Sequence, residues 1–192
     1  MESVKKIETS LPEVFILEPR VFGDERGFFL ESYNERVFAE LGIPHHFVQD
    51  NHSRSTQNVL RGLHYQVQHT QGKLVRVVEG EILDVAVDMR RSSASFGKSV
   101  AVSLSGDSKR MVWIPHGFAH GFRVVSAEAH VLYKATDYYA PEHERTLLWS
   151  DPDLNIDWKL QGGPIVSAKD QRGVPFRHAE CFEQAQSKNR FA

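Results

Sequence analysis

The chain has 192 residues, of which 41% are hydrophobic and 25% charged, the composition of one folded domain of ordinary size. Its formal net charge of -2 excludes an overall electric field that would favour nucleic acid or an anionic membrane. The single cysteine, Cys181, excludes an intramolecular disulfide and suits a reducing compartment.

The N-terminal residues show no targeting pattern. Residues 1–9 mix both charge signs and lack the apolar stretch of a secretory signal. No window is long and uncharged enough for a membrane span. We therefore expect a soluble, cytoplasmic protein, with residues 1–192 forming a single domain and about 184–192 a frayed tail.

One helix is predicted near the N-terminus, between Asn34 and Leu41. Asn34 is a suitable N-cap, and Gly42 with Pro44 ends the helix. Val37, Phe38 and Leu41 form its expected buried stripe.

Strand patterns dominate the rest of the chain. They cover residues 75–78, 82–88, 99–104, 110–114, 121–125 and 130–136, with a glycine turn at 79–81. In the second of these, Leu83, Val85 and Val87 share one face, and Asp84 with Asp88 falls on the other. Beyond Pro141 the pattern is less regular. Many short strands at roughly even spacing predict an all-β sandwich or barrel with a few short helices.

Ten histidines raise the question of a metal site. The second residue after His64 is Gln66, where a metal site built on two strands would place another histidine. Lys73 stands nearby, and its charge would repel a cation. Because zinc and iron take about three or four protein ligands, we expect no catalytic metal.

The sequence lacks the motifs of nucleophilic serine catalysis and of nucleotide cofactor binding. It contains no Gly-x-Ser-x-Gly elbow, no Gly-x-x-x-x-Gly-Lys-Ser/Thr loop and no Gly-x-Gly-x-x-Gly. Nucleotide triphosphate hydrolysis and dinucleotide-dependent redox chemistry therefore lack sequence support, and general acid–base catalysis is what remains.

Residues 60–76 carry the groups for such proton transfer. His64 can take a proton near neutral pH, Lys73 can hold a developing oxyanion, and the arginine fork of Arg61 suits a phosphate-bearing ligand. A base needs an orienting carboxylate, which Asp170 could supply, although a turn residue is its simpler interpretation. The acid could be any tyrosine of the group Tyr133, Tyr138 and Tyr139, which could equally close a sheet edge.

A second basic site is suggested by Arg26, which stands in residues 23–29 between glycines and beside aromatic side chains. An arginine next to aromatic faces is suited to holding a nucleobase and its phosphates. Arg20, Arg36 and Arg54 are interpreted as ordinary solvated charges, and this simpler interpretation is also open for Arg61.

Six ordered blocks, between about Pro12 and Asp170, resemble the dTDP-4-dehydrorhamnose 3,5-epimerases. They are residues 21–33, 47–53, 60–66, 71–76, 113–122 and 132–139. The resemblance implies a cupin-like jelly-roll β-barrel, a homodimer and a dTDP-sugar substrate, with no cofactor, no metal and no nucleic-acid or membrane partner.

The resemblance also implies residue roles. His64 would be the base, paired with Asp170, while Tyr133 would be the acid on the opposite face of the sugar and Lys73 would stabilise the enolate. The implied substrate-binding residues are Gln49, Asp50, Asn51, Arg61, His120, Tyr138, Glu144 and Lys169, together with Arg26 and Glu31 offered by the partner subunit.

The implied reaction inverts C3 and C5 of dTDP-4-dehydro-6-deoxy-D-glucose to give dTDP-4-dehydro-L-rhamnose. A C4 ketone acidifies the hydrogens on both neighbouring carbons, so no redox cofactor is needed. Two alternatives remain open from the sequence. One is a related enzyme that inverts a single carbon or isomerises the ketone, and the other is a non-catalytic sugar-binding or metal-binding cupin.

Overall fold

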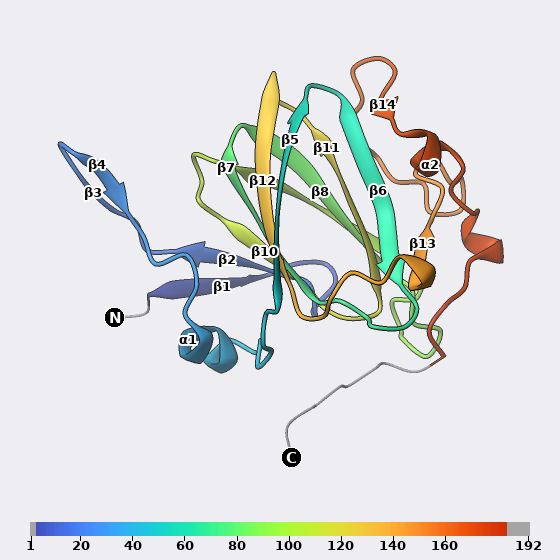
Figure 1. The fold of residues 1–192 in the computed structure, drawn as a ribbon, viewed down its shortest axis with the longest axis horizontal. Coiled ribbons are helices and arrows are strands. Elements are labelled where there is room, and N and C mark those ends of the chain that lie inside the picture. Colours follow the sequence, from blue (N-terminus) through green and yellow to red (C-terminus); the bar gives the residue numbers. More distant parts are fainter. Residues whose placement is uncertain (1–2, 184–192) are drawn as a thin grey trace.

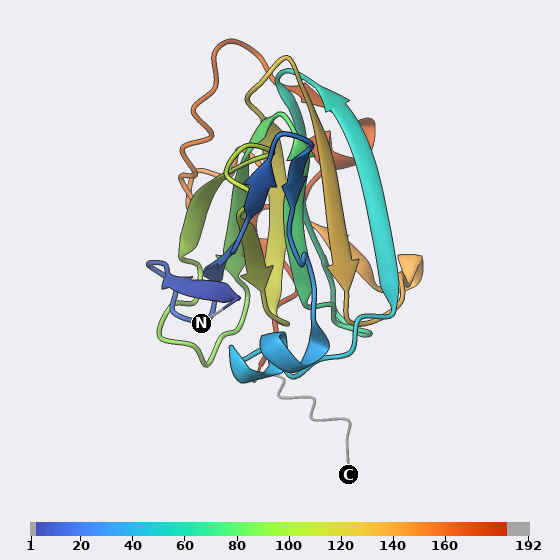
Figure 2. The same cartoon turned by 90° about the vertical axis from the view of Figure 1, so that its left-hand side faces the viewer.

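Two antiparallel β-sheets face each other in the computed structural model, which describes residues 3–183 (Figures 1 and 2). The first sheet has the order β1-β2-β10-β7-β12-β5, with bounds Val4–Glu8, Phe15–Pro19, Met111–Ile114, Lys73–Glu79, Glu128–Ala135 and Gln49–Thr56. The second sheet has the order β13-β6-β11-β8-β9, with bounds Glu144–Thr146, Val59–Gln66, Phe118–Val124, Glu81–Asp88 and Ser99–Ser105. Together they form the predicted all-β, cupin-like jelly-roll barrel.

Short elements complete the fold. The hairpin of β3 (Phe22–Asp24) and β4 (Gly27–Phe29) projects away from the barrel, as Figure 1 shows. Strand β14 (Ile165–Val166) runs parallel to β6. The helices are α1 (Glu35–Glu40) and α2 (Ala168–Gln171), with 3-10 turns at Pro141–His143 and Phe176–His178. No helix within residues 3–183 is long and apolar enough to cross a membrane.

Strand β8 shows how the sequence pattern builds the barrel. Ile82 and Ala86 pack in the core between the two sheets. Val85 and Val87 face the other way, into a cluster with Trp158 of the C-terminal segment. The predicted alternation is therefore confirmed, and both faces of the strand are covered because the C-terminal segment packs on the second sheet.

Helix α1 begins as predicted, because the Asn34 side chain accepts hydrogen bonds from the backbone N–H groups of Arg36 and Val37. Of the expected buried stripe only Phe38 is fully buried. Val37 and Leu41 are half-buried and pack against the same cluster as Phe38.

All six strands predicted from the pattern are present, with ends that differ by at most three residues. The strands that pattern reading missed include β1, whose side chains are mostly exposed, and β5, whose sequence QDNHSRST is polar on both faces. An edge strand that borders a cavity need not alternate between apolar and polar residues, and this removes the periodic signal. The tail expected at about 184–192 lies outside the described residues.

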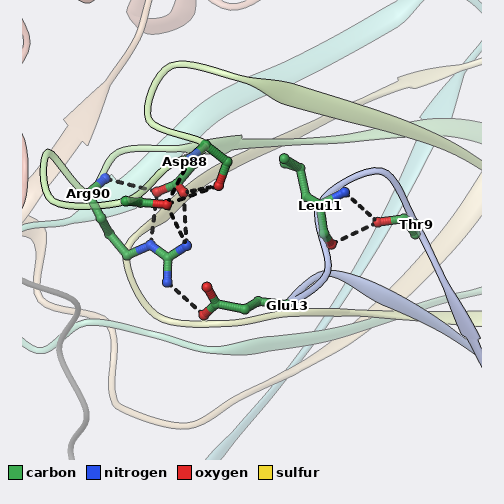
Figure 3. Close-up of polar contacts among 7 residues, drawn as sticks. Thr9, Leu11, Glu13, Asp88 and Arg90 are labelled. Carbon is green, nitrogen blue, oxygen red and sulfur yellow. Dashed lines mark hydrogen bonds and ion pairs between the residues drawn. The ribbon is translucent and has the colours of Figure 1, made fainter.

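A buried ion-pair network closes one part of the barrel (Figure 3). Arg90 donates from Nε to Asp88 Oδ1 at 2.8 Å and from Nη1 to Glu13 Oε2 at 2.6 Å. Both Asp88 and Arg90 are buried. Beside them the Thr9 hydroxyl donates to the carbonyl oxygen of Leu11 and accepts from its N–H, which shapes the turn between β1 and β2. The network ties that turn to the end of β8, and neither buried charge is left unpaired.

Candidate active site

A cavity of about 530 Å³ lies between the two sheets, bordered on one side by β14 and α2. Its polar lining comes from elements far apart in the sequence. The residues are Ser53 from β5, Arg61 and His64 from β6, Lys73 from β7, His120 from β11, Tyr133 from β12, and Ser167, Lys169 and Asp170 at α2. The structure thus brings the expected base, acid and oxyanion-binding group to one cavity.

His64 and Asp170 form a close pair at this cavity. His64 Nε2 lies 2.6 Å from Asp170 Oδ1, and Asp170 is only 3% exposed. Burial by itself raises the pKa of Asp170, but the hydrogen bond and charge of His64 and the N–H of Gly62 outweigh it, so the pKa lies below its usual value. A charged Asp170 accepts the Nε2–H, and the Nδ1 lone pair of His64 is then free to take a proton.

The position of Asp170 follows from its local structure. It lies in the short helix α2, where the Ser167 hydroxyl caps its backbone N–H at 3.1 Å. The backbone of Asp170 thus belongs to a short helical turn, while its side chain lies within hydrogen-bond distance of His64.

Two glycines explain why β6 and β11 present their histidines together. His64 and His120 are paired in register, and the pairing becomes irregular between His120 and Phe122. Gly62 has a φ of 122°, and a Cβ there would lie 2.6 Å from the Cα of Gly121. A side chain at Gly62 would separate the strands, so glycine is required for this close approach.

A second histidine–aspartate pair was missed by the sequence analysis. His120 Nε2 lies 2.8 Å from Asp84 Oδ2, and both residues are buried. The sequence did contain one indication of this pair. Asp84 lies on the face of β8 that carries the core residues Ile82 and Ala86, and a carboxylate buried there needs a partner.

Lys73 is one of the cationic residues that line the cavity. Burial lowers its pKa to about 8, although the charges of Asp84 and Glu144 partly oppose this shift. The ammonium group therefore remains mostly protonated at pH 7. In a poorly solvated site such a charge stabilises an oxyanion far better than it would in water.

Tyr133 has the properties of a proton donor. It is half-buried, and burial raises its pKa, with Arg61 opposing and Glu144 adding to the shift. The phenol is thus protonated at neutral pH. It projects from the first sheet, whereas His64 projects from the second, so the two groups enter the cavity from opposite sheets.

Further charged groups surround the cavity. Arg61 donates from Nε to Ser55 Oγ at 3.0 Å. Lys169 Nζ lies 2.6 Å from Glu144 Oε1, and the Tyr139 hydroxyl donates to Glu144 Oε2 at 2.8 Å. Burial raises the pKa of Glu144, but these two hydrogen bonds and the charges of Lys169 and His64 outweigh it, so the pKa is lowered. Sequence reasoning named Tyr139 only as one of three candidate acids, and its bond to Glu144 had no sequence signal.

The side chain of Gln66 forms hydrogen bonds with the backbone of two loops. Its Nε2 donates to the carbonyl oxygens of His69 at 2.6 Å and Tyr138 at 3.2 Å, and its Oε1 accepts from the N–H of Ala140 at 2.9 Å. The Tyr138 side chain is exposed and does not line the cavity. No group of three or more potential metal-ligating residues occurs in the part of the chain that the structure describes.

Side chains alternate between the two faces of a strand, so residues 49–51 of β5 do not all point the same way. Gln49 Nε2 donates to Asn51 Oδ1 at 2.9 Å, and Gln49 Oε1 accepts from the N–H of Tyr139. Asp50 points to the other face of β5 and pairs with Lys134 at 2.9 Å. Asp50 and Asn51 border a smaller cavity of about 210 Å³, which Tyr133 also lines.

Arg26 and Glu31 lie outside the cavity formed by their own chain. The Arg26 side chain is 86% exposed in the β3–β4 hairpin and pairs with Asp24 at 2.5 Å. Glu31 is exposed as well. The structure therefore does not bring these two expected residues to the site within one subunit.

The sequence of the chain is similar to those of known proteins over most of its length. The family model of dTDP-4-dehydrorhamnose 3,5-epimerase matches residues 8–178. The chain is 58% identical to the dTDP-4-dehydrorhamnose 3,5-epimerase of Pseudomonas aeruginosa over 93% of its length and 99% of the relative's. It is 56% identical to that of Shigella flexneri over 92% of its length and 98% of the relative's.

A solved structure gives the same result. The fold matches, with a TM-score of 0.93 and 50% identity, the crystal structure of dTDP-6-deoxy-D-glucose-3,5-epimerase RmlC from Legionella pneumophila in complex with dTDP-4-keto-L-rhamnose. The match covers 96% of this chain and 100% of that one.

Proposed function

The chain belongs to the dTDP-4-dehydrorhamnose 3,5-epimerase family, and from this membership we propose that its cavity inverts C3 and C5 of dTDP-4-dehydro-6-deoxy-D-glucose to give dTDP-4-dehydro-L-rhamnose. The enzyme is an isomerase. The observation that carries the proposed mechanism is the meeting of the His64–Asp170 pair, Lys73 and Tyr133 at one cavity.

The first step is removal of a proton by His64. Nδ1 of the imidazole takes the hydrogen from C3 or C5, and Asp170 stabilises the imidazolium that forms. The electron pair of the broken C–H bond moves to the C4 oxygen, giving an enolate. The ammonium group of Lys73 stabilises that negative oxygen.

The second step is reprotonation from the opposite face. Tyr133 gives its phenolic proton to the same carbon, the enolate collapses to the ketone, and the configuration is inverted. His64 then holds one extra proton and Tyr133 lacks one. Both must exchange protons with solvent before the next inversion, and the partial exposure of both residues, 28% for the His64 side chain, permits this exchange.

The nucleotide is held by the groups around the cavity. Arg61 and Lys169 offer positive charge for the diphosphate, and His120, fixed by Asp84, adds a hydrogen-bonding nitrogen next to the sugar. We assign Gln49, Asp50, Asn51, Tyr138 and Glu144 to the same substrate site on the family resemblance.

A homodimer completes the site in this proposal. Arg26 and Glu31 lie outside their own cavity, so they would serve the partner's site. The surrounding hairpin exposes Phe22, Phe28 and Phe29 by 50–68%, an apolar surface of the kind that partners cover. We also propose that residues 1–192 form one domain and that the enzyme is cytoplasmic, which the free thiol of Cys181 supports.

The function is tested by NMR of dTDP-4-keto-6-deoxyglucose with the enzyme in heavy water. Because each inversion passes through solvent-exchanging groups, the product should carry deuterium at both C3 and C5. Inversion and labelling at one carbon only would instead support a single-carbon epimerase. No labelling at either carbon would support a sugar-binding protein without catalysis. The names of relatives more than half identical favour two inversions.

The dimer is tested by mixing two impaired variants, Arg26→Ala and His64→Asn. In a mixed dimer one site would have both intact residues, so mixing and re-equilibrating the subunits should restore activity to about a quarter of wild type at limiting substrate. Failure to restore activity, with mixed dimers present, would contradict the donation of Arg26 across the interface.

A further inference from the structure

The cavity contains a polar group that the proposed mechanism does not use. Ser53 lines the cavity, yet its Oγ is buried and has no hydrogen-bond partner among residues 3–183. A buried hydroxyl without a partner is unfavourable, and native proteins seldom leave one unexplained. A ligand that enters the cavity could supply the missing partner.

The neighbours of Ser53 on β5 define where it lies along the sugar site. Asn51, Ser53 and Ser55 occupy alternate positions of the strand, so they share one face. Asn51 is paired in register with Tyr133, the proposed acid, and Ser53 with the core residue Val131. Ser55 accepts the hydrogen bond from Arg61. Along β5, Ser53 therefore lies between Asn51, which is next to Tyr133, and Ser55, which contacts Arg61.

This order matches the order of groups on the substrate. The diphosphate is attached to C1 and would be held at Arg61, and Tyr133 would deliver protons to C3 and C5. C2 lies between C1 and C3, and its hydroxyl is the ring hydroxyl whose carbon is not inverted. We infer that the Ser53 hydroxyl binds the C2 hydroxyl of the ketosugar.

The inference rests on the proposed function for the identity of the sugar, and on the buried hydroxyl for the contact. Rotation about the single χ1 bond of serine carries its hydroxyl between staggered positions, so Oγ reaches the cavity without movement of the strand. A contact to a hydroxyl that keeps its configuration can persist through both inversions, which holds the ring while its neighbours react.

The test compares Ser53→Ala with Ser55→Ala, a matched change two residues away on the same face. Each variant is assayed with dTDP-4-keto-6-deoxyglucose and with its 2-deoxy counterpart, and its affinity for dTDP and its melting temperature are measured. Ser53→Ala should lower kcat/KM about 3- to 10-fold for the full substrate, and less than about 2-fold for the 2-deoxy sugar. Its dTDP affinity and melting temperature should be unchanged, because no protein hydrogen bond is lost.

Ser55→Ala should behave differently. It removes the partner of Arg61, so dTDP binding should weaken and both substrates should be affected alike. The inference is overturned if Ser53→Ala lowers the melting temperature and slows both substrates equally, or if it changes neither substrate. If the proposed reaction itself is wrong, the wild type will fail to invert either carbon. In that case, the affinity of each variant for the sugar nucleotide, divided by its affinity for dTDP, still tests the contact between Ser53 and the sugar.

Discussion

Replacement of Asp170 by asparagine tests the most specific geometric feature of the site. The amide has the same shape as the carboxylate but no charge, so it cannot stabilise an imidazolium at the 2.6 Å contact with His64. A hydrogen bond to a charged group contributes about 1.5–3 kcal/mol, or about 10- to 150-fold in rate. The amide can also donate to Nε2, which moves the imidazole proton to Nδ1 and removes the lone pair that acts as base.

The two effects together predict that Asp170→Asn lowers kcat by about 10⁴-fold, the loss that follows when a histidine base is held in the wrong tautomer. The assay is the rate of deuterium entry at C3 and C5, followed by NMR. The matched control is Asp151→Asn, because Asp151 is equally buried at 3% but accepts only from the backbone N–H groups of Asp153, Leu154 and Phe176. The control should lose stability and retain kcat.

A rate for Asp170→Asn within about threefold of wild type would refute the role of Asp170 as the orienting group. The pH dependence of stability provides an independent check. Because the folded-state pKa of Asp170 is lowered, its contribution to stability is present at neutral pH. That contribution is lost as the pH falls below about 4, through the folded-state pKa. The asparagine variant should lack this part of the acid-induced loss.

Three other substitutions give separate tests. Tyr133→Phe should keep proton exchange from the His64 side but slow inversion by about 10²- to 10⁴-fold, and unchanged product formation would exclude Tyr133 as the acid. Lys73→Met should lower kcat by about 10²- to 10³-fold without lowering the melting temperature, because a buried charge is removed. The wild-type rate should fall as the pH rises through about 8, where Lys73 loses its proton, and a flat profile up to pH 10 would contradict its role. Arg90→Met should lower the free energy of unfolding in urea by about 3–5 kcal/mol, because Asp88 is left as an unpaired buried charge. Adding Asp88→Asn should recover part of that loss, and additive losses would contradict the pairing.

Some structural features could be predicted from the sequence because they depend only on residues that are close together in the chain. The cap of Asn34 needs only its own helix, and the alternation of β8 needs only a period of two. The His64 and Lys73 segment stood out because charged groups among strand-forming apolar residues must face a partner or a cavity.

What the sequence left open depends on contacts between distant residues. Asp170 reaches His64 across 106 positions, and Asp84 reaches His120 across 36. Neither pairing has a local pattern, because the fold of the C-terminal segment brings Asp170 to β6 and the register of β8 with β11 brings Asp84 to His120. Gln66 was recognised only as a missing metal ligand, since its three backbone partners lie in two separate loops.

The proposed mechanism depends most on the imidazole of His64, which removes the hydrogens next to the ketone. The direct measurement is deuterium incorporation at C3 and C5 by the His64→Asn variant in heavy water, with dTDP affinity as the test that the site is intact. We predict that dTDP binding is retained while incorporation falls by at least about 10³-fold at both carbons. Incorporation at the wild-type rate in that variant would contradict the mechanism.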